Sequence, residues 1–357
     1  MWSVLDAREF SASTLCLAVR IMSALLSLYF LLLYIGKSIS AEEADCRVYN
    51  NLYVCLEGET LQSVAFEDVH AVQTIEDIEL HLENLGITHI KENAFNDVRN
   101  ASALYLRDNR MSKIFRHYFH TLDQLTYLDL NNNSISDIED GSFVRLVSLE
   151  TLLLDNNMLS KFRLGTWKGL TYLHELYATN NTLALKKNMF KGLSHLETLA
   201  LDSNGISEIP LGTFNGIPHI DLLYLSRNLI SRLNPDVFRG LREVNELDLG
   251  RNCIVSVSSG VFRHMKTLES LWLNGNFIAT LEDDVFEGLE GLSSLFLNSN
   301  DFTSVKMSAF ANMRNVTIEP GFKIDGSPVI HFGKIHGLYR CTSSGYQEPY
   351  ECEKVTK

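Results

Sequence analysis

One pattern of about 24 residues recurs along most of this 357-residue chain. The segments YLDLNNNSISDIEDGSF (127–143) and LWLNGNFIATLEDDVF (271–286) share the motif L-x-L-x-x-N-x-I-x-x-I/L, followed by an aromatic residue ten positions after the Asn. Ten copies follow one another in register, and every step is 24 residues except one of 23. A fixed period of this length is typical of solenoid proteins, in which each repeat stacks on its neighbours. The first leucines of the ten copies are Leu80, Leu104, Leu128, Leu152, Leu176, Leu199, Leu223, Leu247, Leu271 and Leu295.

The L-x-L part of each copy predicts a short β-strand. Its two leucines are separated by the two-residue period of a strand, so both point to the same side. A strand this short is not stable alone, so the strands are expected to pair side by side in one parallel sheet. The Asn of each copy is expected to be buried, because an amide can satisfy backbone groups where the chain turns out of the strand. The first copy has Leu85 at this position, and the others have the ladder asparagines Asn109, Asn133, Asn157, Asn181, Asn204, Asn228, Asn252, Asn276 and Asn300.

The aromatic position of each copy predicts a stack of rings on the side of the solenoid opposite the sheet. Rings that recur at the period of the fold are expected to belong to its core and not to a binding site. The ten residues of this aromatic spine are Phe95, Phe119, Phe143, Trp167, Phe190, Phe214, Phe238, Phe262, Phe286 and Phe310.

The ten copies resemble the repeats of extracellular leucine-rich repeat proteins of the typical 24-residue class, and the resemblance covers about residues 75–313. In this respect the chain is similar to Toll-type receptor ectodomains and to insect leucine-rich immune and adhesion proteins. The resemblance implies an α/β solenoid, a leucine-rich repeat horseshoe with a concave parallel β-sheet, about ten repeats and disulfide caps at both ends. It also implies recognition of proteins, or of microbial or matrix components, without signalling activity of its own.

The segments outside the repeats are expected to form a signal peptide and two caps. Residues 21–36 are a predominantly apolar run, which as a helix would extend about 24 Å and fall short of the ~30 Å hydrocarbon core of a membrane. Small residues follow this run, which favours a secretory signal peptide over residues 1–40, with Met22 as an alternative start. The other interpretation is an uncleaved membrane anchor. The remaining boundaries are an N-terminal cap at 41–74, the repeats at 75–313 and a C-terminal cap at 314–357.

Two close pairs of cysteines bracket the repeats. Cys46 and Cys55 lie in DCRVYNNLYVC (45–55), and Cys341 and Cys352 lie near the end of the chain. In an exported protein such pairs predict two local disulfides, one in each cap.

Cys253 has no partner in this arrangement. A leftover thiol in an oxidising compartment suggests an interchain disulfide, which would make a disulfide-linked dimer. The alternatives are a buried, inert thiol and a thiol paired with a cap cysteine after reshuffling.

Composition and motif content argue against several functions. The formal net charge is −13, which disfavours nucleic acid as a partner. An enzyme needs a nucleophile or an acid–base pair in a cleft, or a metal cluster, and the sequence shows neither a nucleophile motif nor a phosphate-binding glycine loop. The segment HYFH (117–120) places two histidines beside a spine aromatic, without a third metal ligand at a convincing spacing. The sequence therefore predicts a protein that is not an enzyme and that needs no metal or cofactor.

The residues before, between and after each L-x-L pair are expected to point outward on the concave face, where the fold hardly constrains them. Eight of these 30 residues are acidic, and only Arg107 is a fixed cation. The face is therefore predicted to be negative and to attract basic groups. The eight acids are Glu79, Glu83, Asp129, Asp155, Glu175, Asp202, Glu246 and Asp248.

The last two repeats carry an aromatic patch without charges. Trp272 and Phe296 occupy the central positions of neighbouring strands, which lie ~4.8 Å apart. Exposed aromatic side chains rimmed by polar residues are typical of protein-binding hot spots. The alternative is that the C-terminal cap covers and buries these rings. The predicted ligand-binding residues of the concave face are Trp272, Phe296, Tyr224, Tyr177, Tyr105, Asp248, Glu246, Asp202 and Glu175.

Four N-x-S/T sequons predict N-glycosylation in an exported protein. Two of them, Asn132 and Asn180, directly precede ladder asparagines at the end of a strand. Glycans there would crowd one edge of the sheet and direct a partner toward the C-terminal repeats. The four sequon residues are Asn100, Asn132, Asn180 and Asn315.

These observations predict a secreted, non-enzymatic binding protein. Its concave face is expected to recognise a protein or a microbial or matrix ligand with basic and apolar elements, in innate immunity or cell-surface recognition. Trp272 and Phe296 would anchor this ligand. Two alternatives stay open: an adhesion protein tethered to the plasma membrane by residues 21–36, and a structural matrix component without a single high-affinity ligand.

Overall fold

The computed structural model describes residues 44–67, 77–302, 304–310, 317–319, 329–331, 338–342 and 351–355. The chain divides into two units, Met1–Asp45 and Cys46–Lys357, and almost all described residues belong to the second. The predicted signal peptide with its alternative start, and the sequon at Asn315, lie outside the described residues. Within the described ranges, no helix is long and apolar enough to cross a membrane.

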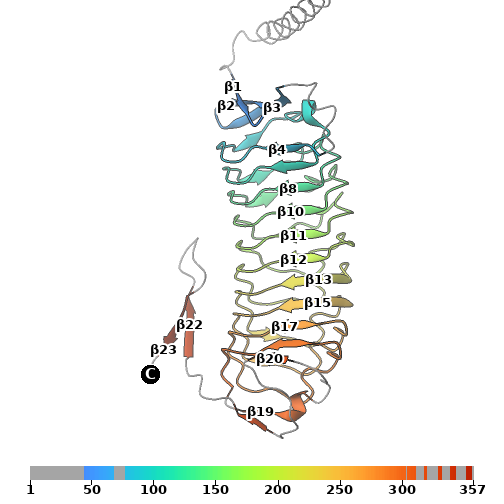
Figure 1. The fold of residues 1–357 in the computed structure, drawn as a ribbon, viewed down its shortest axis with the longest axis vertical. Coiled ribbons are helices and arrows are strands. Elements are labelled where there is room, and N and C mark those ends of the chain that lie inside the picture. The colour runs from blue at the N-terminus through green and yellow to red at the C-terminus, as the bar shows by residue number, and fades with distance from the viewer. Residues whose placement is uncertain are drawn as a thin grey trace, which may run out of the picture. The chain divides into compact units, whose positions relative to one another are not determined.

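The leucine repeats form one parallel sheet of 11 strands (Figure 1). Equivalent residues of neighbouring repeats lie side by side, as in the pairs Leu80↔Leu104 and Leu247↔Leu271. The sheet continues one strand beyond the ten predicted, because β20 pairs with β18 in residues that the sequence analysis placed in the C-terminal cap. From one end to the other the strands are β4 (Glu79–His81), β6 (Ala103–Tyr105), β8 (Tyr127–Asp129), β10 (Thr151–Leu153), β11 (Glu175–Tyr177), β12 (Thr198–Ala200), β13 (His219–Tyr224), β15 (Glu243–Asp248), β17 (Ser270–Trp272), β18 (Ser294–Phe296) and β20 (Thr317–Glu319).

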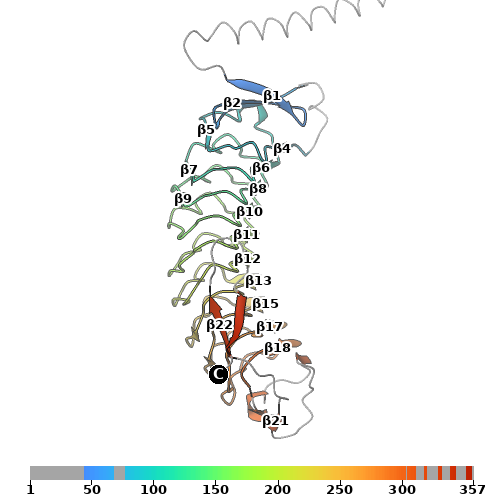
Figure 2. The same cartoon turned by 90° about the vertical axis from the view of Figure 1, so that its left-hand side faces the viewer.

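Smaller elements complete the turns of the solenoid. The pair formed by β7 and β9 lies on the side away from the main sheet (Figure 2). The paired short strands are β7 (Lys113–Ile114) with β9 (Asp137–Ile138), β14 (Arg232–Leu233) with β16 (Ser256–Val257), and β19 (Ser304–Lys306) with β21 (Val329–His331). Two 3-10 helices are described, η2 (Asn96–Val98) and η3 (Met307–Phe310).

The ladder asparagines are buried and bonded to the backbone, as predicted. Asn228, which is 3% exposed, is representative of them. Its Oδ1 accepts the N–H groups of Asn204 and Ile206 at 2.9 and 3.0 Å. Its Nδ2 donates to the carbonyl oxygens of Leu201 and Leu225 at 2.9 and 3.0 Å. Each amide therefore joins backbone groups of successive repeats where the chain leaves the sheet.

The aromatic spine is also confirmed as core. From Phe190 onward each ring stacks on the next, with centroids 5.7–6.4 Å apart. Trp167 takes the place of Phe in the fourth copy, stacks on Phe190 at 6.4 Å and donates from Nε1 to the carbonyl oxygen of Met189 at 2.7 Å. The indole N–H is thereby satisfied within the core, which explains why this position accepts a polar ring.

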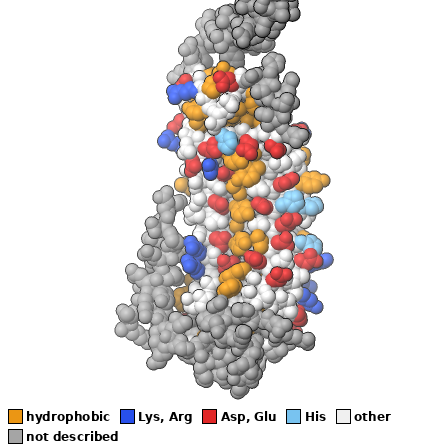
Figure 3. Space-filling model, viewed as in Figure 1, with side chains coloured by type: hydrophobic (Ala, Val, Ile, Leu, Met, Phe, Trp, Pro, Cys, Tyr) orange, Lys and Arg blue, Asp and Glu red, His pale blue; other side chains and the backbone are white. Residues whose placement is uncertain are grey.

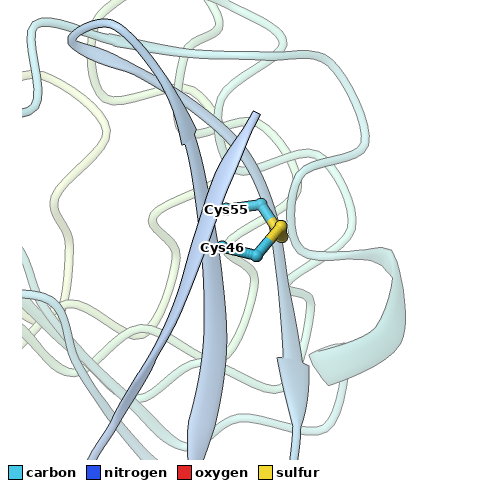
Figure 4. Close-up of a disulfide and its surroundings, with 2 residues drawn as sticks. All are labelled: Cys46 and Cys55. Carbon is cyan, nitrogen blue, oxygen red and sulfur yellow. A yellow bond between two sulfur atoms is a disulfide. The ribbon is translucent and has the colours of Figure 1, made fainter. Parts of the chain in front are cut away.

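A small sheet caps the N-terminal end of the stack. Its strands lie in the order β1 (Asp45–Tyr49), β2 (Leu52–Glu57), β3 (Thr60–Phe66) and β5 (His89–Ile90). The pairing of β3 with β5, which belongs to the first repeat, covers the apolar end of the solenoid. The predicted disulfide between Cys46 and Cys55 is present (Figure 4).

The described backbone near the C-terminus contains an antiparallel pair, β22 (Leu338–Thr342) with β23 (Glu351–Val355). Its register places Cys341 opposite Cys352. The side chains of these strands lie outside what is described, so the second disulfide stays a prediction.

Candidate protein-binding surface

The outward side chains of the main sheet form the predicted concave face, called the strand face below. Figure 3 shows a stripe of hydrophobic side chains along the middle of this face, with acidic side chains beside it. The stripe follows the central position of each L-x-L pair, because the parallel register places these positions next to one another. The central row consists of His81, Tyr105, Asp129, Leu153, Tyr177, Ala200, Tyr224, Asp248, Trp272 and Phe296.

Trp272 and Phe296 form a stacked pair at the C-terminal end of the stripe. Their ring centroids are 5.1 Å apart and their planes differ by 1°. Both side chains are partly exposed, as are the uncharged Ser270, Asn274 and Asn298 around them. The two rings therefore form one stacked apolar cluster with a polar rim, which is typical of a binding hot spot.

A second aromatic cluster lies at the other end of the stripe. His81 stacks on Tyr105 with centroids 4.5 Å apart, and Tyr105 contacts Tyr127 at 5.2 Å. The imidazole also lies between two carboxylates, 3.2 Å from Glu79 and 3.1 Å from Glu83. Only Tyr105 of these three was predicted as a binding residue; the register pairs it directly with His81, whereas Tyr127 lies diagonally, opposite Ala103.

The middle of the stripe is formed by Tyr177, Ala200 and Tyr224 on neighbouring strands. Ala200 is only 3% exposed, because it lies in the row between two much larger side chains. Burial raises the pKa of both tyrosines, and the nearby carboxylates of Glu175 and Glu246 raise it further. Both phenols are therefore protonated at neutral pH; that of Tyr177 already bonds the carboxylate of Glu175, which also raises its pKa.

The aspartates of the strand face are less accessible than predicted. Asp129 is 3% exposed, so its expected outward exposure is wrong; it lies in the row between the larger Tyr105 and Leu153. Its carboxylate accepts the N–H of Asn131 at 2.9 Å. The side chain of Asp155 also bonds the backbone, accepting the N–H of Thr179 at 2.6 Å. Both carboxylates therefore have an internal role: Asp129 bonds within its own repeat, and Asp155 links two successive repeats.

Asp202 and Asp248, which were predicted to bind a ligand, behave similarly. Asp202 accepts both the N–H and the hydroxyl of Ser226, at 2.8 and 2.7 Å. Asp248 accepts the N–H of Gly250 at 2.7 Å. Burial raises the pKa of both carboxyl groups, against the effect of these hydrogen bonds. Their role in binding stays a prediction, and one oxygen of each is already engaged within the protein.

The raised pKa of Asp248 leads to a stability prediction. Its contribution to stability is fully present below its ordinary pKa of 3.8 and is lost as the pH rises through the higher pKa of the folded state. Asp248→Asn mimics the uncharged form and keeps the acceptor oxygen. We therefore expect the variant to melt about 2 °C above the wild type near neutral pH, with the difference shrinking as the pH falls toward 3.8.

Thermal unfolding between about pH 4 and pH 7 measures this difference. The control is Asp221→Asn, because Asp221 is exposed on the same face and its charge is already hydrated. A melting temperature of the Asp248 variant equal to or below that of the wild type near neutral pH would contradict the assignment.

Acidic side chains that remain accessible lie along the edge of the sheet at which the strands begin. Glu175 and Glu246, both predicted as binding residues, are partly exposed there. Four further exposed acids lie one position earlier, outside the positions flanking each leucine pair, and were not predicted. These are Glu150, Glu197, Asp221 and Glu269.

The remaining predicted sites are placed as follows. Cys253 is a free thiol among the described cysteines and is partly buried, and this burial raises its pKa. The interchain disulfide stays a prediction.

The two histidines of HYFH bond groups of the protein itself. His117 bonds the carbonyl oxygen of Ile90 at 3.1 Å. His120 bonds the carbonyl oxygen of His117 at 2.6 Å and the side-chain amide oxygen of Asn93 at 3.1 Å. Within the described residues, no group of three or more His, Cys, Asp and Glu side chains could hold a metal ion.

Three sequons lie in described parts of the chain. Asn100, Asn132 and Asn180 are all exposed. The side chains of Asn132 and Asn180 donate to their neighbours one repeat earlier, at 2.9 and 2.7 Å. Both follow the ends of strands in the N-terminal half of the sheet. Glycans at these positions, which stay a prediction, would leave β13 to β18 uncovered.

Comparison with known proteins identifies the class of this scaffold. The leucine rich repeat family profile matches residues 79–135, 123–183, 178–230, 218–278 and 266–318. These overlapping segments cover more than half of the chain, which therefore belongs to the leucine-rich repeat family. Solenoids of this family generally serve as protein-interaction modules. None of the curated proteins compared with the chain matches it significantly.

Several solved structures share the fold. One is described as a complex of TLR13 with ssRNA13, with a TM-score of 0.58 and 24% identity over 74% of this chain and 42% of that one. Another is an octameric complex of latrophilin 3, Unc5D and FLRT2, with a TM-score of 0.54 and 24% identity over 71% and 83%. The leucine-rich repeat domain of APL1B has a TM-score of 0.51 and 21% identity over 70% and 78%. This chain thus spans less than half of the TLR13 chain, and identities this low show the fold alone.

Proposed function

We propose that this protein is a secreted, non-enzymatic recognition protein whose strand face binds a partner protein through Trp272 and Phe296. The observation that carries the proposal is the stacked, partly exposed ring pair with uncharged polar neighbours. The solenoid does not require aromatic side chains at the central position, which holds Asp129 and Ala200 in other repeats. A contact area of this kind, whose register neighbour on the preceding strand is Asp248, is suited to anchoring an apolar side chain of a partner that also carries a basic group.

The charge of the strand face favours a protein over a nucleic acid. The structurally similar TLR13 is described in complex with an RNA, whereas the strand face of this chain carries many carboxylates and, in the three positions around each leucine pair, only Arg107 as a fixed cation. A phosphate backbone would be repelled by such a surface. A partner with apolar and basic groups is complementary to it, and proteins of innate immunity, cell-surface recognition or the matrix offer such groups.

Removing both rings is expected to abolish most of the binding. The Trp272→Ala/Phe296→Ala variant should lose affinity by about 30-fold or more, because a hot-spot residue contributes about 2 kcal/mol or more. Affinity capture from extracellular fluid identifies the partner, and titration of that partner against both proteins measures the loss. Circular dichroism establishes that the variant is folded.

The matched control removes two large side chains elsewhere. Leu164 and Leu211 are 78% and 57% exposed and precede spine aromatics, away from the main sheet. The Leu164→Ala/Leu211→Ala variant should bind the partner like the wild type. A ring variant that captures the same proteins with the same affinity as the wild type would remove Trp272 and Phe296 from the binding site.

Secretion is the second part of the proposal, and it rests on residues 21–36. Cleavage of the predicted signal peptide gives a mature protein that begins near Glu42. N-terminal sequencing of the exported protein tests this. A protein that keeps residues 21–36 and stays with the membrane fraction would be the tethered adhesion protein instead.

A further inference from the structure

The fourth residue after the first leucine of each repeat has the same unusual backbone conformation in all ten repeats. All ten have positive φ, between 53° and 69°. This conformation favours Gly, Asn and Asp, and six of the ten positions hold one of these residues. The ten are Asn84, Asp108, Asn132, Asn156, Asn180, Ser203, Arg227, Arg251, Gly275 and Ser299.

Arg227 and Arg251 are therefore unexpected at this position. They follow consecutive strands of the sheet, β13 and β15, and each has a φ of 53°. Arginine gains nothing from this backbone conformation, and two guanidinium groups on adjacent strands repel each other. The backbone conformation explains neither residue, so the function of their charge is the question.

Both guanidinium groups are accessible. Arg251 is exposed and Arg227 is partly exposed. Within the protein, the charge of Arg227 acts to lower the pKa of Asp202 and that of Arg251 to lower the pKa of Asp248, although burial outweighs both effects. The next repeat has Gly275 at the equivalent position, where a Cβ atom would come within 3.2 Å of Cγ of Arg251. The glycine thus leaves room for the arginine side chain to lie along the edge of the sheet.

The opposite edge of the sheet carries the opposite charge. The two positions before the first leucine contain, over all ten repeats together, seven acidic residues and no lysine or arginine. Asp221 lies within β13 and Glu246 within β15, and Glu197 and Glu269 directly precede the neighbouring strands β12 and β17. From β12 to β17 the strand face is therefore acidic at the two positions before each first leucine and basic just after β13 and β15 end. Its middle row is aromatic at Tyr224, Trp272 and Phe296, with the half-buried Asp248 among them.

We propose that the strand face over β12 to β18 binds a protein segment that carries an apolar row between a row of lysines or arginines and a row of carboxylates. Guanidinium groups bind carboxylates with paired, charge-assisted hydrogen bonds, so Arg227 and Arg251 form the carboxylate-binding side. The acids at the beginning of the strands bind the basic row, and Trp272 with Phe296 anchors the apolar row. The inference rests on the proposed function and adds the charge pattern of the partner.

The dimensions of the surface fit one helix or one extended segment. The six residue steps from Asp221 at the acidic edge to Arg227 at the basic edge span at most about 20 Å, and a helix with its side chains is about 10–12 Å wide. Long charged side chains of a partner helix therefore reach both edges. The central row from β11 to β18 extends for about 24 Å at ~4.8 Å per strand, which corresponds to about 16 residues of helix.

Three synthetic helical peptides of about 16 residues provide the probe. All share one apolar row with a central Phe, and their two flanking rows are Lys and Lys, Lys and Glu, or Glu and Glu. Rotating a peptide by half a turn in the plane of the sheet exchanges its flanks, so the Lys/Glu peptide can always place its lysines at the acidic edge. Isothermal titration or fluorescence polarisation with the full-length protein gives the three affinities.

For the wild type we expect the Lys/Glu peptide to bind most tightly, about fivefold better than the Lys/Lys peptide, with the Glu/Glu peptide weakest. In Arg227→Glu/Arg251→Glu, the Lys/Lys peptide should instead bind more tightly than the Lys/Glu peptide. In Arg227→Asn/Arg251→Gly, which restores residues that this position has in other repeats, the preference should disappear without backbone strain. The control Lys168→Glu/Lys191→Glu removes the same charge from exposed residues that follow the spine aromatics, and it should keep the wild-type order.

The outcomes separate the two proposals. Equal affinities, or a Lys/Lys peptide that binds wild type at least as tightly as the Lys/Glu peptide, overturn the charge pattern but leave the aromatic anchor if Trp272→Ala/Phe296→Ala still abolishes binding. Binding with the expected order that survives this ring variant supports the charge pattern and overturns the anchor. Failure of all three peptides to bind the wild type overturns both.

Discussion

Replacing Asn228 by leucine is expected to lower the free energy of unfolding by about 3–5 kcal/mol. Asn228 is 3% exposed, and its Oδ1 is the acceptor for the N–H groups of Asn204 and Ile206. Leucine has a similar volume but leaves both N–H groups buried without a partner, at about 1–3 kcal/mol each. The carbonyl oxygens that lose Nδ2 are less affected, because each also accepts from the ladder amide of an adjacent repeat.

Urea denaturation measures this loss, and amide hydrogen exchange locates it. Because a solenoid repeat contacts only its neighbours, exchange should accelerate mainly between β12 and β15. The control is Asn215→Ala, which removes one exposed hydrogen bond to Asn188 and should change the stability by less than about 0.5 kcal/mol. Similar losses in both variants would show that the ladder amide is not a structural link.

Truncating the aromatic spine at Phe238 is expected to cost about 3–5 kcal/mol. Phe238 is fully buried and stacks on Phe214 at 6.0 Å and on Phe262 at 6.4 Å. Phe238→Ala removes contacts to both rings and leaves a cavity that the neighbouring backbone cannot fill, because two stacked repeats fix the gap between them. Phe238→Leu keeps most of the volume and should cost less than half as much.

Chemical denaturation of the two variants beside Leu211→Ala tests this expectation. Leu211 is 57% exposed and belongs to the preceding repeat, so its truncation should leave the stability within about 0.5 kcal/mol of the wild type. If Phe238→Ala were as mild as Leu211→Ala, the spine would not be part of the stabilising core.

The buried half of each repeat could be predicted from the sequence because its environment repeats with the motif. Leu247 lies between two other first leucines. Asn228 shares with the neighbouring ladder asparagine Asn252 a bond from Nδ2 to the carbonyl oxygen of Leu225 and an N–H accepted from the repeat before. The residue type at such a position is dictated by geometry that all ten copies share. The same reasoning missed β20, because Thr317–Glu319 pairs with β18 without an L-x-L motif.

The candidate site was only partly predictable, because outward side chains do not share a common environment. Trp272 and Phe296 could be paired from their spacing, since strands in register place residues 24 positions apart side by side. The accessibility of Asp202 could not be predicted in this way. It depends on Ser226, one repeat later, whose N–H and hydroxyl both bind the carboxylate.

The amino-acid sequence alone determined the period, the strands and the core of this protein, because those depend on residue types at fixed offsets within one repeat. Tertiary structure decided which side chains the surface presents. Ala200 is buried between Tyr177 and Tyr224, and Arg251 extends along the sheet edge beside Gly275. In each case exposure is set by the size and charge of a residue one repeat away, and these sizes and charges vary along the solenoid because the fold leaves them free.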